Sequence, residues 1–130
     1  MKNSLLITKY IRSILSEDKE LLKLIPIDHF YAVDAKLGTK YPFCVIIRTG
    51  MVDNQSKDGM YEDIITVSLI VVDDNYIGSI TIANEIRNWL EGHRFKDETI
   101  NIKQFKLTSS SENWYNDAYI QELQFNVYIL

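Results

Sequence analysis

The sequence predicts one α+β domain: a mostly antiparallel four- to five-stranded sheet with an N-terminal helix and one long central helix packed on one face. Segments with the apolar pattern of strands follow one another without a helix between them, which favours antiparallel pairing. Two other segments repeat apolar residues every three or four positions, as amphipathic helices do. No linker or internal repeat interrupts residues 1–130, so we expect a single domain.

Residues 4–16 are predicted to form the first helix, with Ser4 as its N-cap. Residues 18–24 are expected to form a short second helical turn, which Pro26 ends because proline disfavours helical backbone at the preceding residue. Residues 27–33 are then predicted as a short strand. The apolar stripe of the first helix comprises Ile7, Tyr10, Ile11, Ile14 and Leu15.

Residues 43–49 are predicted to form an interior strand, which Tyr41-Pro42 opens. The polar residues between Gly50 and Gly59 are expected to form a long hairpin loop. Residues 64–72 carry the strongest strand pattern in the chain, because β-branched residues occupy both faces. This segment is therefore expected at the centre of the sheet.

Residues 76–90 are predicted to form the long central helix, with Asp74 or Asn75 as its cap and Gly92 as its end. Two further strands, over residues 99–107 and 119–129, are expected to form a second hairpin. The polar stretch 108–117 is predicted to be the loop that joins them. The apolar stripe of the central helix comprises Tyr76, Ile80, Ala83, Ile86 and Leu90.

Composition narrows the functional classes. A net charge of −4 and a pI near 5.1 leave no global positive field, so we expect no specific nucleic-acid ligand. The single cysteine, Cys44, can form no intrachain disulfide and is expected to be an inert, buried residue. No apolar run is long enough to cross a membrane, so we expect a soluble protein that is made in the cytoplasm.

No catalytic, cofactor or metal constellation is predicted. His29 and His93 lack a second ligand at a recognised metal-binding spacing. Asp73 and Asp74 are adjacent and are better explained as helix caps. The serines at 109–111 have no nucleophile-elbow pattern, and no nucleotide-binding glycine motif is present. We therefore expect a protein that is not an enzyme.

Trp114 and Tyr115 stand out because they are large aromatic residues in a polar stretch. Two explanations are open. Both side chains fold back onto the sheet, or they anchor an interface between subunits.

The order of elements and several local patterns resemble the phage tail-completion proteins, also called tail terminators or minor head-tail joining proteins. The resemblance spans most of the chain, and its specificity comes from the joint order of the patterns. The residues that carry it are Asp58-Gly59-Met60-Tyr61-Glu62-Asp63 before the strand at 64–72, Asp74-Asn75-Tyr76 before the helical residues 77–87, Tyr41-Pro42-Phe43, Glu112-Asn113-Trp114-Tyr115-Asn116-Asp117, Gln121 and Phe125.

This resemblance implies a structural protein of a phage or prophage virion. Such a protein assembles with itself, commonly as a hexameric ring, at the head-proximal end of the tail tube, where it halts tube growth and meets the head connector. Ring interfaces are heterologous, so one patch must match a different patch on the neighbour. Our interface candidates, placed in the two polar connections, are Met51, Asp53, Lys57, Met60, Trp114 and Tyr115.

Two other functions stay open. A small-ligand-binding or regulatory α+β module without catalysis predicts a monomer or dimer with an apolar pocket between helix and sheet. A hydrolase or nuclease predicts that Asp73, Asp74 and a histidine meet in one cleft.

Overall fold

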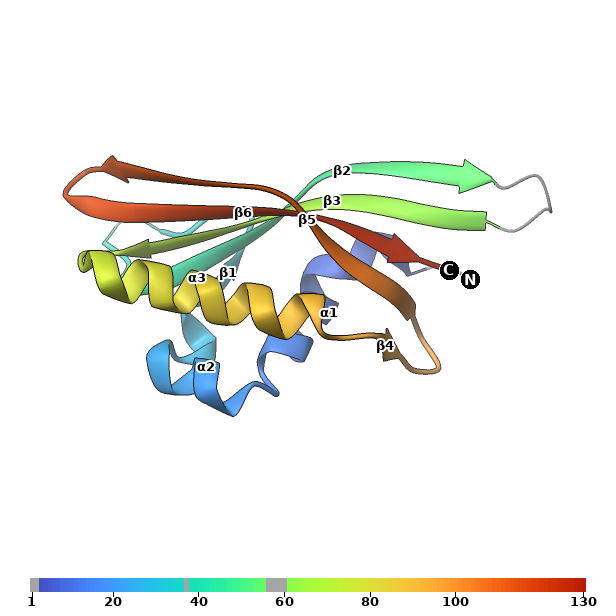
Figure 1. Cartoon of the computed structure of the whole chain (residues 1–130), viewed down its shortest axis with the longest axis horizontal. Coiled ribbons are helices and arrows are strands. Elements are labelled where there is room, and N and C mark those ends of the chain that lie inside the picture. Colours follow the sequence, from blue (N-terminus) through green and yellow to red (C-terminus); the bar gives the residue numbers. More distant parts are fainter. Residues whose placement is uncertain (1–2, 37, 56–60) are drawn as a thin grey trace.

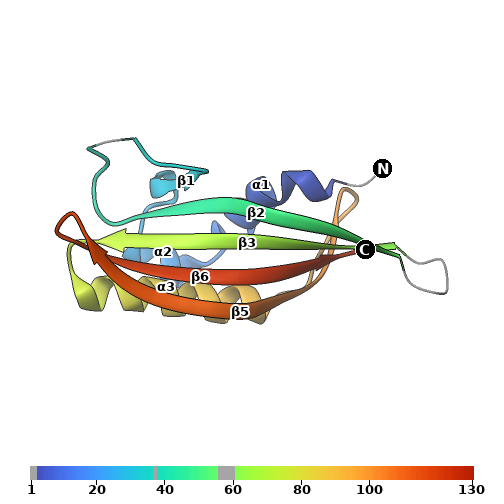
Figure 2. The ribbon, with the colours of Figure 1, turned by 90° about the horizontal axis from the view of Figure 1, so that it is seen from above.

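The computed structural model describes residues 3–36, 38–55 and 61–130. It shows a long, twisted sheet with the helices gathered on one face (Figure 1). Seen from above, the strands run along the long axis of the molecule and the other face of the sheet is free of helices (Figure 2). The predicted packing of both helices on one face is confirmed.

The helical elements are η1 Ser4–Leu6, α1 Ile7–Leu15, α2 Lys19–Leu24, η2 Ile27–His29 and α3 Tyr76–Glu91, where η marks a 3-10 helix. The strands are β1 Phe30–Ala32, β2 Phe43–Gln55, β3 Tyr61–Asp73, β4 Phe95–Lys96, β5 Asn101–Tyr115 and β6 Ala118–Ile129. The second helical turn is thus confirmed as α2. Only the last part of the strand predicted at 27–33 is extended, because η2 takes up its beginning.

The described residues form a six-stranded sheet in the order β1-β2-β3-β6-β5-β4. The expectation of four to five strands is therefore wrong, because β4 pairs through only two residues and has no sequence pattern of its own. The sheet is antiparallel except at one edge, where β1 pairs with β2 in parallel. β3 lies in the middle, as predicted for residues 64–72.

Both hairpins are much longer than predicted. β2 continues to Gln55 and β5 to Tyr115, so most of the two expected loops is paired strand. The physical reason is that the backbone ladder to the adjacent apolar strand holds these polar segments extended. The connection between β5 and β6 is a turn at Asn116 and Asp117, which have φ values of 52° and 59°. Such values are typical of the two-residue turns that favour asparagine, aspartate or glycine.

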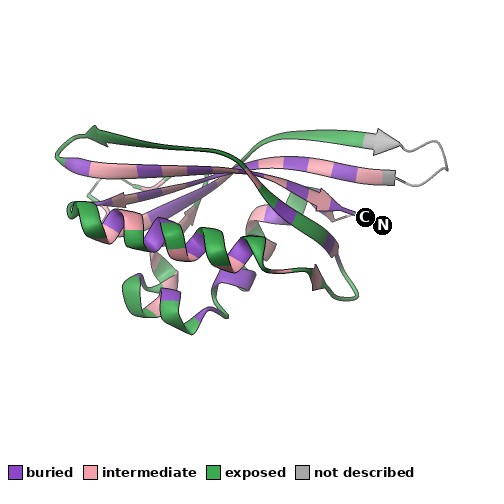
Figure 3. Cartoon of the chain, in the orientation of Figure 1, coloured by how far each residue is buried: buried purple, intermediate pink, exposed green. Residues whose placement is uncertain are grey.

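The core lies between α1, α3 and one face of the sheet, which we call the helix face. Alternate residues of β3 and β6 are buried there, whereas their neighbours on the outer face are mostly half-buried (Figure 3). The alternation predicted for residues 119–129 is therefore confirmed. The helix-face residues of these two strands are Asp63, Ile65, Val67, Leu69, Val71, Asp73, Tyr119, Gln121, Leu123, Phe125, Val127 and Ile129.

The stripe of α3 differs slightly from the prediction. Its buried residues are Ser79, Ile82, Ala83, Ile86 and Leu90, so Ile82 replaces Ile80, and Tyr76 is exposed. Ser79 belongs to this stripe although it is polar, because its hydroxyl accepts a buried hydrogen bond from the Gln121 amide of β6.

Specific hydrogen bonds fix the helix ends. Asn75 caps α3 by accepting from the Gly78 amide at 2.8 Å, which confirms one of the two predicted caps. Gly78 lies against the Asp73 carboxylate, which would have to move to admit a Cβ at this position. Ser4 is not a cap: its hydroxyl donates to the buried Asp63 carboxylate on β3 at 2.5 Å.

Phe125 is the most direct test of this core, because it is fully buried in the middle of β6. Phe125→Ala is expected to lower the free energy of unfolding by about 3–5 kcal/mol, measured by urea denaturation. Tyr115→Ala, at an exposed aromatic, serves as the control and is expected to change it by about 0.5 kcal/mol or less. Equal effects of the two substitutions would contradict the assignment of the core.

A carboxyl pair joins α2 to α3. Asp18 caps α2 by accepting from the Leu21 amide at 3.3 Å, and its second carboxylate oxygen is buried without a hydrogen-bond partner in the described structure. That oxygen gains a donor only when Glu85 is protonated, and this hydrogen bond with Asp18 raises the pKa of Glu85, while burial and the Asp18 charge act in the same direction. The protonated form of Glu85 is thus favoured in the folded state.

Glu85→Gln is expected to raise the melting temperature at neutral pH, because the amide keeps a donor for Asp18 and removes a charge. The stabilisation from protonated Glu85 is present below its usual pKa of 4.5 and is lost as the pH rises through the raised folded-state value. The advantage of the variant should therefore shrink on acidification, as thermal unfolding across pH will show. Glu98→Gln, at an exposed turn carboxylate, should give no such trend.

Candidate interaction surfaces

The two long hairpins point to opposite ends of the molecule. The β5–β6 tip, residues 112–119, lies beyond the start of α3, and β2 and β3 extend past the helices at the other end (Figures 1 and 2). The predicted interface candidates therefore lie at opposite ends of the molecule where the structure describes them. Lys57 and Met60 lie outside the described residues.

Trp114 and Tyr115 are exposed by 56% and 67%, so neither folds back onto the sheet. Because they are adjacent in β5, their side chains point to opposite faces. Trp114 is paired with Tyr119 and belongs to the helix face, whereas Tyr115 is paired with Ala118 on the outer face. The two aromatics form two separate surfaces.

A polar cluster lies on the helix face at the same end of β5 as Trp114. The Glu112 carboxylate accepts from the Tyr76 hydroxyl at 3.0 Å and from the Gln121 amide at 3.1 Å. Gln121 also donates to Ser79 at 3.3 Å, and the Tyr76 ring lies edge-on to Tyr119 at 5.4 Å. The hydrogen bond to Glu112 raises the pKa of Tyr76. Glu112 is thus held in place at the exposed end of the sheet.

Tyr115 borders a hollow of 660 Å³ on the outer face. The hollow lies between the segment that precedes β2 and the ends of β3 and β6. Tyr41 stacks on Phe43 at 5.9 Å at its rim. Its apolar lining comprises Val33, Tyr41, Phe43, Val45, Ile70, Val72, Tyr115, Ala118 and Ile120.

Met51 and Asp53 lie on β2 rather than in a loop, which corrects their predicted setting. A β-bulge at Thr49 shifts the register, so Arg48 pairs with Val67 and Met51 pairs with Ile65. Both partners are core residues, which places Arg48 and Met51 on the helix face. Met51 is 43% exposed there.

Much of the sheet edge has no strand partner in the described part of the chain. β1 pairs with β2 only at Cys44–Ile46, and β4 pairs with β5 only at Asn101 and Ile102. Residues 47–55 of β2 and 103–115 of β5 therefore form open edges, one on each side of the sheet. An open edge is a template for pairing with another chain. We missed these edges because we predicted loops in their place.

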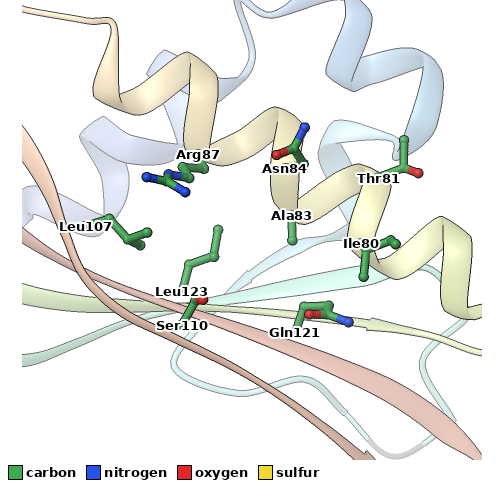
Figure 4. A pocket seen from close by; sticks show the side chains of 9 residues that line it. All are labelled: Ile80, Thr81, Ala83, Asn84, Arg87, Leu107, Ser110, Gln121 and Leu123. Carbon is green, nitrogen blue, oxygen red and sulfur yellow. The ribbon is translucent and has the colours of Figure 1, made fainter.

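A groove of 420 Å³ runs beside the open edge of β5 (Figure 4). Leu107, Ser110 and Leu123 line it from the sheet, and the side chains of α3 line it from the helix. Arg87 stands at one end, where its guanidinium pairs with Glu91 at 3.2 Å. The residues from α3 are Ile80, Thr81, Ala83, Asn84 and Arg87.

The residues needed for a hydrolase or nuclease do not meet. Asp73 precedes α3 and His93 follows it, so the two lie about 24 Å apart along the helix. His29 instead donates from its ring to the Pro42 carbonyl at 2.8 Å. Burial and the hydrogen bond with Asp74 raise the pKa of Asp73. No group of three or more metal-binding side chains is found in residues 3–36, 38–55 and 61–130.

Cys44 is fully buried in β2, and burial raises the pKa of its thiol. The predicted burial of this cysteine is confirmed. No helix of the described residues has the length and apolar character required to cross a membrane.

The turn at Asn116 and Asp117 sets the position of the β5–β6 tip. Asp117→Ala is expected to lower the free energy of unfolding by about 1 kcal/mol, because a Cβ-bearing residue without a local hydrogen-bonding side chain is unfavourable at positive φ. Asp117→Gly and Asp117→Asn are the matched controls and should retain stability. Chemical denaturation of the three variants distinguishes these outcomes, and an equal loss in all three would contradict the role of φ.

No protein-family model matches the sequence, and a search of curated proteins finds no match. Among solved structures, a chain of the structure described as "Virion of native gene transfer agent (GTA) particle" is similar to this chain. The TM-score is 0.78 at 13% sequence identity, and the match covers 92% of this chain and 90% of that chain. The chain therefore has the fold of that virion chain over nearly all of its length.

Proposed function

We propose that this chain is a structural protein of a phage or prophage virion, which assembles at the head-proximal end of the tail tube, ends tube growth and joins the tail to the head connector. In this role the chain is not an enzyme and needs no cofactor. Its partners are copies of itself, in a closed ring, and the tube and connector proteins. The fold shared with a chain of a gene transfer agent virion supports this proposal, as does the resemblance to tail-completion proteins.

The observation that carries the proposal is the long antiparallel sheet with open edges on both sides. Three antiparallel steps separate β2 from β5, so these two strands run in opposite directions. A second copy placed beside the first in the same orientation therefore brings its β2 antiparallel to β5. The contact is heterologous, because it joins β5 of one copy to a different strand, β2, of the next. Repeated from copy to copy, it closes into a ring if the rotation between neighbouring copies allows it.

The alternative, a small-ligand-binding module without catalysis, is supported by the groove between α3 and the sheet. Its lining of Leu107, Leu123 and Ile80 is apolar, and Gln121 contributes a polar group. This module would hold its ligand as a monomer or dimer.

Mass determination by light scattering across concentration, together with co-purification with a tail-tube protein, tests the proposed role. The expected result is concentration-dependent assembly into rings, visible by electron microscopy, and retention on immobilised tube protein. A chain that stays monomeric at every concentration and is not retained by the tube protein would overturn the proposal and favour the ligand-binding module.

A further inference from the structure

Resting on the proposed function, we infer that copies of this chain join through β5 of one copy and β2 of the next in one defined register, with Arg48 opposite Glu112 and Met51 seated in the groove beside α3.

Steric limits leave only a short window for this pairing. On β2, the edge at Cys44–Ile46 is occupied by β1, and on β5 the edge at Asn101 and Ile102 is occupied by β4. A neighbouring strand therefore pairs with residues 47–55 of β2 and within residues 103–115 of β5. When the two strands pair antiparallel, the start of the β2 window lies opposite the end of the β5 window. Arg48 is near that start and Glu112 is near that end.

Charge selects the register within the window. Arg48 is exposed on the helix face of β2 and makes no hydrogen bond or ion pair with the described residues of its own chain. Glu112 is on the helix face of β5, because its strand partner is the buried Gln121 and it bonds to Tyr76 of α3. Opposite charges directly across two strands stabilise the pair, and the diagonal position places Trp114 within reach of the guanidinium.

The same register explains the groove. With Thr49 bulged as it is against β3, Gly50 of the second copy faces Ser111 and Met51 faces Ser110. Ser110 lines the groove, and its floor is formed by Leu107, Leu123 and Ala83 (Figure 4). An unbranched thioether side chain fills an irregular apolar gap well. Met51 of one copy would thus fill the groove of the other, and both apolar surfaces would be removed from water.

Cysteine pairs test the register directly. Chains carrying Met51→Cys and chains carrying Ser110→Cys, mixed and oxidised, are expected to form disulfide-linked dimers that neither variant forms alone. The double variant is expected to give a ladder of linked oligomers, since within one chain the two positions are separated by at least three strand spacings, about 14 Å, and cannot bridge. Cys44 is buried and does not compete. Ser109→Cys is the matched control, because Ser109 points to the outer face.

Charge reversal gives an independent readout. Arg48→Glu and Glu112→Arg are each expected to weaken self-association about tenfold, and the two together are expected to restore it. Circular dichroism checks that Glu112→Arg still folds without its contacts to Tyr76 and Gln121.

These experiments distinguish a wrong register from a wrong assembly role. If sedimentation shows oligomers but the Ser110→Cys mixture does not link, or the Ser109→Cys mixture links equally well, the register is wrong while the assembly role stands. If the wild-type chain forms no oligomer at any concentration and is not retained by tube protein, both fail.

Discussion

One constraint organises this molecule: helices cover the sheet on a single face. α3 covers the helix face of β3 and β6, where residues such as Val67, Leu69 and Phe125 are excluded from water, and α1 packs against β2 and α3. All helices lie on that side, so the helices leave the outer face and both long edges uncovered (Figure 1). The outer strands join this core through Cys44 and Ile46 of β2 and through Ile102 and Phe105 of β5. Residues 48–53 and 108–115 of the same strands are held mainly by backbone pairing, which leaves their side chains available for contacts with other molecules.

The helices stay in place through a few polar contacts that complement the apolar core. The Trp89 ring donates to the Ile14 carbonyl at 2.9 Å and so connects α3 to the end of α1. The bond from Ser4 to Asp63 ties the N-terminal segment to β3. Buried hydrogen bonds of this kind contribute modestly to the net stability, but they leave few alternative ways to dock the same helices.

The central elements were predictable because local pattern and tertiary burial agree in them. Residues 64–72 and 119–129 are rich in apolar residues, as buried strands are. α1 and α3 repeat apolar residues every three or four positions, as helices with one buried face do. The outer strands were not predictable in the same way, since the segment 108–113 has no apolar face and is extended only because β6 lies beside it. The sequence did hold a signal: no glycine or proline interrupts residues 101–115, as an ordinary loop of that length would often require.

The candidate surfaces were found only in part. Trp114 and Tyr115 were predicted as large aromatics in polar surroundings and Met51 by its place in an expected loop, and all three are exposed. Arg48 and Glu112 were not predicted, because a single charged residue in a strand becomes informative only when its face and its edge are known. The parallel pairing of β1 was also missed, since three residues carry too little pattern to define a direction.

The bulge at Thr49 has a consequence for how this chain can change. Side chains alternate along a strand, so a residue that is left out of the pairing keeps everything beyond it on its present face, whereas the same residue taken into the ladder would invert that face. If Thr49 paired with Thr66 in a continuous ladder, Met51 and Asp53 would turn toward the outer face and Val52 toward the helices. Deletion of Thr49 would instead leave Met51 opposite Ile65, so relatives that are one residue shorter at this point can still present the same side chains to a neighbour.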